Sequence, residues 1–134
     1  MNVADYLPHR PPMLLVDRID EVTADHVVCS STIAPDWVFV RDGVVHASAM
    51  LELVAQACAI HAGTRAGGGT PRAGMLVACR EATLHVETLA VGDELTITAT
   101  RLPGAPPLTT FDGTVRRGAE LCVTLQLSVM EGDA

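Results

Sequence analysis

The longest helical pattern in the chain runs from His46 to Ala66 and is apolar on nearly every side. A helix on a protein surface usually shows one apolar stripe and a charged opposite face. Here the apolar residues surround the helical wheel: Ala49, Met50, Leu51, Leu53, Val54, Ala55, Ala57, Cys58, Ala59, Ile60 and Ala62. The pattern therefore predicts a buried central helix near Ser48 to Gly63.

Three polar residues interrupt this apolar run at intervals of four: Ser48, Glu52 and Gln56. This spacing places them on one face of the helix. A carboxylate in a core is costly without a partner, so we expect Glu52 to meet a donor, to open onto a cavity or to keep its proton. Buried carboxylates concentrate at functional sites, which favours a functional role over the alternative that the line is simply the solvent-facing edge of the helix.

The segments on either side of the helix alternate apolar and polar residues with period 2, which is typical of half-buried strands. Before the helix, this pattern covers residues 13–22 and 26–33. Beyond the glycine-rich stretch 66–71, which is expected to stop the helix, it covers residues 74–85, 94–102, 108–115 and 120–130. Trp37 and Phe39 lie in the connection before the helix and are either packing anchors or part of a pocket wall.

Five or six strands and one apolar helix predict an α+β fold. We expect a curled antiparallel sheet wrapped around one long central helix, in a single domain spanning residues 1–134. One sheet covers only one side of a helix that is apolar all round. A dimer is the expected cover for the other side.

The composition excludes several classes of function. The net charge is −7 and the nine arginines are scattered along the chain, so nucleic acid is not an expected partner. No apolar run reaches the roughly 18 residues of a membrane span, and the N-terminus lacks a signal-peptide pattern, which predicts a cytoplasmic protein away from membranes. Neither the histidines nor the cysteines show metal-ligand spacing, so we expect no metal and no cofactor. The cysteines are predicted to be small core residues: Cys29, Cys58, Cys79 and Cys122.

Four sequence motifs resemble the hotdog-fold β-hydroxyacyl-acyl-carrier-protein dehydratases: YLPHRPPMLLVDRI, LELVAQA, GMLVACREATLH and VGDEL. Their order and spacing match that family over nearly the whole chain. The resemblance implies the hotdog fold and an acyl thioester substrate, carried on acyl carrier protein or coenzyme A. It also implies a homodimer or higher oligomer, or a heterodimer with a related dehydratase.

One catalytic motif of the family is missing. The family places a His fourteen residues before the helix carboxylate, in an HFPG-like segment, and this position holds Val38. His46 and Ala47 occupy the positions where a Pro-Gly pair would open the helix. The chain is thus similar to a divergent branch, the dehydratase-like subunits of polyketide-type or aryl-polyene pathways.

Dehydration of a 3-hydroxyacyl thioester needs a base, an acid and donors for the thioester oxygen. We assign the acid to Glu52 and the base to His46, the histidine beside the helix start. The amides of Ala47 and Ser48 are expected to hold the thioester oxygen, and Gln56 is expected to line the substrate site. The resemblance gives His9, in the LPHR motif, a structural role.

Two other functions stay open at this point. The first is thioester hydrolysis, in which Glu52 alone would orient or activate water. The second is a non-catalytic acyl-binding or heterodimeric subunit whose partner supplies the missing His. Loss of the HFPG-like segment favours this second function.

Overall fold

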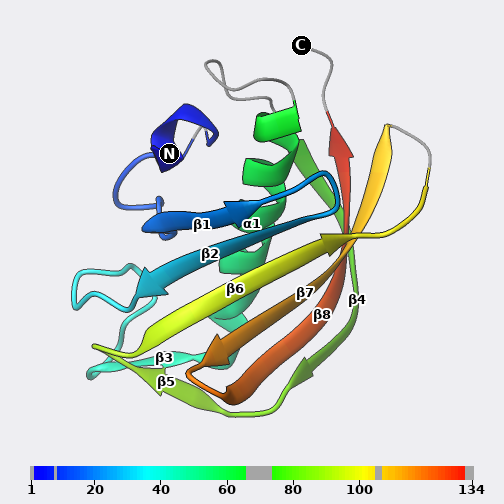
Figure 1. The fold of residues 1–134 in the computed structure, drawn as a ribbon. Coiled ribbons are helices and arrows are strands. Elements are labelled where there is room, and N and C mark those ends of the chain that lie inside the picture. Colours follow the sequence, from blue (N-terminus) through cyan, green and yellow to red (C-terminus); the bar gives the residue numbers. More distant parts are fainter. Residues whose placement is uncertain (1, 8, 66–73, 105–106, 132–134) are drawn as a thin grey trace.

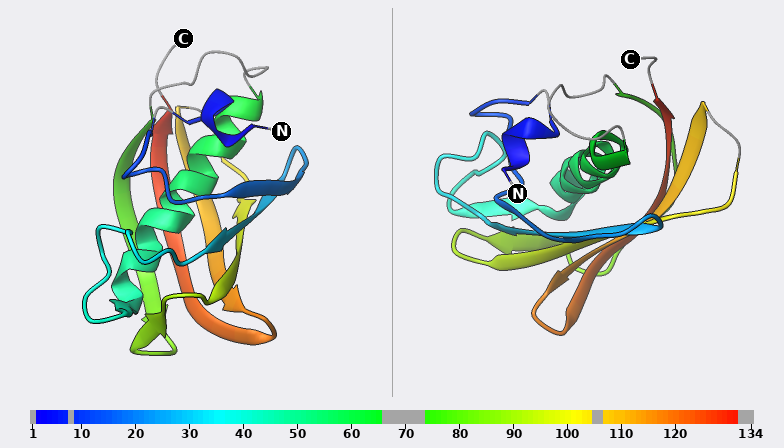
Figure 2. Two further views of the ribbon diagram at one scale, coloured as in Figure 1. Left: turned by 90° about the vertical axis from the view of Figure 1, so that its left-hand side faces the viewer. Right: turned by 45° about the horizontal axis from the view of Figure 1, so that its top comes forward.

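A six-stranded antiparallel sheet curls around one long helix in the computed structural model (Figures 1 and 2). The model describes residues 2–7, 9–65, 74–104 and 107–131. The order of strands across the sheet is β1-β2-β6-β7-β8-β4. These strands are β1 (Arg18–Val22), β2 (His26–Thr32), β4 (Gly74–Leu84), β6 (Glu94–Arg101), β7 (Leu108–Arg117) and β8 (Glu120–Glu131).

The central helix α1 (Met50–Arg65) continues from a short 3-10 turn, η2 (Ala47–Ala49). A second, two-stranded sheet pairs β3 (Val44–His46) with β5 (Thr88–Ala90) just before the helix. Near the far end of α1 lies the N-terminal 3-10 helix η1 (Val3–Asp5) (Figure 2).

The helix packs its large apolar side chains against the concave face of the sheet. Met50, Leu53, Val54 and Ile60 are fully buried there. The approach is closest at Gly113 of β7, where an added Cβ would collide with the side chain of Val54. Glycine is therefore the residue that lets β7 run directly beneath the helix.

One face of α1 is only partly covered. Leu51, Ala55 and Ala59 are half-buried and follow one another at intervals of four, so they lie on the same side of the helix. Within this chain, the sheet thus leaves one side of the helix partly uncovered, as expected from the apolar pattern.

Most of the elements expected from the sequence are present. The predicted α+β hotdog architecture is confirmed, and the strand patterns after the helix correspond to β4, β6, β7 and β8. The proposal that residues 13–17 form the start of a strand is wrong, because β1 begins at Arg18. The predicted helix stop at residues 66–71 lies outside the described residues.

The cysteine prediction holds for three of the four residues. Cys29, Cys58 and Cys122 are buried, whereas Cys79 is exposed on β4. Its strand lies at the edge of the sheet.

In the described part of the chain, no helix is both long and apolar enough to cross a membrane. Nor do three or more His, Cys, Asp or Glu side chains of the described residues come together as a group that could hold a metal ion.

Asp93, in the VGDEL motif, fastens the β5–β6 turn to β7. Its Oδ2 accepts hydrogen bonds from Ala90 N–H at 2.9 Å and from Arg117 Nη1 at 2.7 Å. Burial pushes the pKa of Asp93 upward. The Ala90 and Arg117 hydrogen bonds outweigh this effect and hold the pKa below the usual 3.8.

We expect Asp93→Ala to lower the free energy of unfolding by about 1–2 kcal/mol, because a turn amide and a guanidinium lose their acceptor. A carboxyl group whose pKa is lower in the folded protein than in the unfolded chain stabilises the fold at any pH above its unfolded pKa. This stabilisation is lost as the pH falls through the folded pKa. The difference between wild type and variant should thus be constant near neutral pH and shrink below about pH 4 in urea titrations. A difference that does not change with pH would contradict this account.

Candidate functional site

The site predicted at the helix start is an open hollow of about 350 Å³. It is lined by residues of the loop before β3, the end of β3, the η2 turn and the first turn of α1. These residues are Phe39, His46, Ser48, Ala49, Leu51 and Glu52. Of the two aromatics considered above, Phe39 belongs to the pocket wall, whereas Trp37 is buried as a packing anchor.

Glu52 brings its carboxylate to this hollow and is not enclosed in the core. Its side chain is 31% exposed. Oε1 accepts a hydrogen bond from Gln56 Nε2 at 3.1 Å and lies 3.4 Å from His9 Nε2. The expectation that Glu52 meets donors and opens onto a cavity agrees with this geometry, but its burial is only partial.

Gln56, one turn further along the helix, is 1% exposed and does not line the hollow. Its Oε1 accepts hydrogen bonds from the amides of Leu15 and Val16 at 3.0 and 3.2 Å. Its Nε2 donates to Met13 O at 2.7 Å as well as to Glu52. The sequence predicts that Gln56 lines the substrate site, whereas the structure places it behind Glu52, where it joins that carboxylate to the segment 13–16.

His46 lines the hollow, as its position before the helix suggested. Its Nδ1 lies 2.8 Å from Ser48 Oγ and accepts a hydrogen bond from Ser48 N–H at 3.1 Å. The imidazole is thus the N-terminal cap of η2. Because Nδ1 accepts, the proton of the neutral ring sits on Nε2. In this conformation the second ring nitrogen is a donor, which does not fit the expected role of base.

The two amides that we expected to hold the thioester oxygen are already bonded. Ala47 N–H donates to Glu87 O at 2.9 Å, and Ser48 N–H donates to the His46 cap. Ala47 is also fully buried. Both amides are therefore engaged in this conformation, because the segment 47–49 forms a capped 3-10 turn held by the strand pair β3–β5. A free helix N-terminus would have left these amides open.

Comparison with known proteins gives the family. The family model of the ApeP-like proteins, described as ApeP dehydratase, matches residues 1–134. The chain belongs to this family. A 3-hydroxyacyl-[acyl-carrier-protein] dehydratase, FabZ, of Streptococcus uberis is 33% identical over 102 residues, and the match covers 74% of this chain and 73% of the relative. The resemblance to hotdog dehydratases drawn from the sequence motifs is confirmed.

Two solved structures share the fold of this chain. The ApeI:P dehydratase heterocomplex of Xenorhabdus doucetiae contains a chain that superposes with a TM-score of 0.89 at 25% identity, covering 99% of this chain and 92% of that one. A thioesterase of Staphylococcus aureus superposes with a TM-score of 0.67 at 19% identity, covering 86% and 92%. The second likeness shows the fold alone.

Val38, at the position of the missing His, lies in the loop between β2 and β3 and is 36% exposed. The histidine that reaches Glu52 within the chain is instead His9. Nothing in the sequence pattern predicts this contact, although both residues lie in motifs that resemble those of the dehydratase family. His9 is not among the residues that line the hollow.

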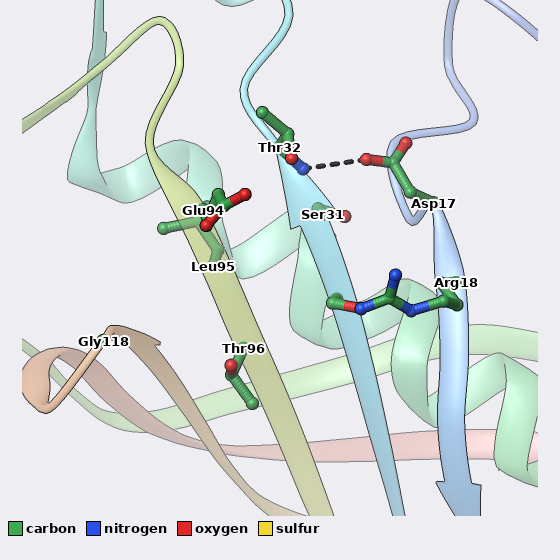
Figure 3. Close-up of a pocket in the computed structure, with 9 residues that line it drawn as sticks. Asp17, Arg18, Ser31, Thr32, Glu94, Leu95, Thr96 and Gly118 are labelled. Carbon is green, nitrogen blue, oxygen red and sulfur yellow. Dashed lines mark hydrogen bonds between the residues drawn. The ribbon is translucent and has the colours of Figure 1, made fainter.

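A second hollow, of about 310 Å³, lies where β1, β2 and β6 run side by side (Figure 3). It has no histidine in its lining. Two of its three charged groups are engaged, since Asp17 Oδ2 accepts from Thr32 N–H at 2.8 Å and Arg18 pairs with Asp20 at 2.6 Å, and Glu94 is the third. The hollow at the helix start is therefore the better candidate for acid–base chemistry.

Burial also argues against a thiol nucleophile in the core. It raises the pKa of Cys29 to about 12 and raises the pKa of Cys58 further. Both thiols stay protonated near neutral pH, and the protonated form is a poor nucleophile.

Proposed function

We propose that this protein removes water from 3-hydroxyacyl thioesters in the hollow at the start of α1. The observation that carries the proposal is the position of Glu52. Gln56 donates to one carboxylate oxygen, and His9 Nε2 lies 3.4 Å from the same oxygen. The Glu52 side chain itself lines an open hollow together with His46. Membership of a dehydratase family supports this choice of reaction among those that a carboxylate could serve.

Glu52 has the position of the group that exchanges protons with the substrate. His46 has the position of a donor, since its Nε2–H is left free by the cap and belongs to a side chain that lines the hollow. A donor there can stabilise the negative charge that develops on the thioester oxygen, the role that we had first given to backbone amides.

His46→Asn tests this role without removing the cap. An Asn side chain also accepts from the Ser48 amide and is a favoured N-cap residue, but it does not extend as far as Nε2. We expect the free energy of unfolding to change by less than about 0.5 kcal/mol. The dehydration rate should fall about tenfold or more. A wild-type rate in His46→Asn and in the capless His46→Ala would remove His46 from the mechanism.

The expected substrate is an acyl group presented as a thioester on acyl carrier protein. The relative in Streptococcus uberis is named for such a substrate, and the open hollow leaves room for an acyl chain to enter from outside. Coenzyme A thioesters carry the same reacting atoms and are the natural comparison in an assay.

We propose that the active form is an assembly with a second hotdog subunit, either another copy or a related dehydratase. β4 closes one side of the sheet without a neighbour in the described part of the chain, and the helix face of Leu51, Ala55 and Ala59 is half-covered. The similarity to a dehydratase heterocomplex supports the mixed form. Either assembly should bury more than about 1,000 Å².

A second candidate, the non-catalytic subunit, is favoured by two observations. Val38 stands where the family has its His, and the amides of Ala47 and Ser48 are already bonded. In this alternative the chain binds or shapes the acyl group and a related subunit performs the chemistry.

One assay separates these functions. The purified protein is given 3-hydroxyoctanoyl-pantetheine, alone and mixed with a related dehydratase subunit. Dehydration produces ultraviolet absorbance from the enoyl thioester, and a thioesterase would release free thiol. If neither signal appears with the protein alone, and if the mixture is no faster than the related subunit alone, the proposed activity is wrong.

A further inference from the structure

From the contacts of its two oxygens, we infer that Glu52 carries out both proton transfers of the dehydration through Oε2. His9 and Gln56 hold Oε1 and thereby aim the carboxylate. This inference rests on the proposed dehydratase function. It explains how the chain could work without the family's His, because one carboxylate would be base and acid in turn.

Both contacts of the carboxylate fall on the same atom. Gln56 Nε2 lies 3.1 Å from Oε1, and His9 Nε2 lies 3.4 Å from Oε1. Oε2 makes no hydrogen bond or ion pair with any described residue, yet it belongs to a side chain that lines the hollow. Oε2 is therefore the oxygen that remains for proton transfer with a bound substrate.

The two histidines near Glu52 are poorly placed to be the base. His46 accepts a hydrogen bond at Nδ1, so its other nitrogen carries the proton of the neutral ring. His9 turns Nε2 toward Glu52, its Nδ1 is buried, and its side chain does not line the hollow. Apart from His46, Glu52 is the one titratable residue in the described lining of the hollow.

The proposed sequence of bonds balances without any further reagent. Oε2 takes the proton from C2, and the electrons of the C2–H bond form the C2=C3 double bond. The C3–O bond breaks with its electron pair on oxygen. The proton held on Oε2 then passes to this oxygen, so water leaves and the carboxylate is restored. C2 and C3 are neighbours, so one carboxylate can reach both when the proton and the hydroxyl lie on the same face.

A substrate with a different leaving group shows whether Glu52 acts as a base or only as an acid. Fluoride departs with its electron pair and needs no proton, so 3-fluorooctanoyl-pantetheine requires a base but no general acid. We expect wild type to form the enoyl thioester from both the 3-hydroxy and the 3-fluoro compound. Glu52→Gln should slow both reactions by about 100-fold or more.

The failure of this inference can be told apart from the failure of the proposed function. If Glu52→Gln still eliminates fluoride within about tenfold of wild type but no longer eliminates water, Glu52 is only the acid and the inference is overturned. The proposed dehydration would then stand with a different base. If wild type eliminates water from no 3-hydroxyacyl thioester, the proposed function fails and the inference fails with it.

His9 is a positioning residue in this scheme, and a conservative variant tests it. The terminal amide of Gln can place an N–H near Oε1, where His9 places Nε2 at 3.4 Å, whereas Leu cannot. We expect His9→Leu to lower kcat about tenfold with KM within about twofold, and His9→Gln to stay within about threefold of wild type.

Two results would overturn the part given to His9. If His9→Gln is as slow as His9→Leu, the imidazole itself takes part in proton transfer. If both variants keep the wild-type kcat, His9 has no influence on Glu52. Thermal unfolding of both variants in the same buffer shows whether a fall in kcat comes from loss of folded protein.

Discussion

Replacing Glu52 by Gln is expected to lower the dehydration rate by about 100-fold or more while leaving the protein folded. A residue that transfers protons in the transition state typically contributes 10² to 10⁴ in rate. Gln has nearly the same shape as Glu, and its side-chain oxygen can still accept the hydrogen bond from Gln56. The variant therefore removes the titratable group and little else.

The matched control is Glu94→Gln in the other hollow, between β1, β2 and β6. The same substitution there removes one negative charge without touching the proposed site, so the rate should stay within about twofold of wild type. If Glu52→Gln keeps its activity within about tenfold, or about 1.4 kcal/mol of barrier, Glu52 is not the proton-transfer residue.

The sequence predicted the fold well because burial alone determines most of it. Which side chains face the core can be read from two patterns in the sequence. One is the apolar pattern on all sides of the helix, and the other is the period-2 alternation in the strands. The small sheet β3–β5 was missed since its strands have three residues each, too few for alternation to show. Residues 13–17 appeared strand-like because Leu15 and Val16 are buried, although their amides bond to Gln56 and not to a strand.

The predicted site is less complete. The four-residue spacing brought out Glu52, and proximity to the helix start brought out His46, and both line the same hollow. The spacing of residues along the chain does not show which hydrogen bonds they make. The Ala47 bond to Glu87 and the His9 contact with Glu52 each join residues from different segments of the chain, and the His46 cap depends on the orientation of one imidazole. Such contacts leave no periodic pattern in a sequence.

The polar line along the helix also has a direction that the sequence does not show. Ser48 is exposed, Glu52 is partly exposed and Gln56 is buried. The line thus runs from the surface inward, and the three residues have different tasks. The innermost one supports the structure around the carboxylate, and its removal is expected to have the largest effect on stability.

Gln56→Leu should lower the free energy of unfolding by about 3–4 kcal/mol. Leu has a similar size, so packing changes little. However, the buried amides of Leu15 and Val16 lose their shared acceptor, and each buried amide without a partner costs about 1–3 kcal/mol. Met13 O loses its donor as well. For a chain of this length the melting temperature should fall by about 10 °C.

Gln126→Leu on β8 is the control, because Gln126 donates to Asp112 at 3.3 Å in an exposed position. Its loss should change the free energy of unfolding by less than about 0.5 kcal/mol.

A second variant, Gln56→Glu, tests the acceptor oxygen of the amide apart from its donor nitrogen. It keeps an acceptor for Leu15 and Val16 but sets a second carboxylate beside Glu52. We expect Gln56→Glu to recover part of the stability at acid pH, where its carboxyl is neutral, and to lose it as the pH rises. Equal stability of Gln56→Leu and wild type in urea titrations would show that the segment 13–16 does not depend on this amide.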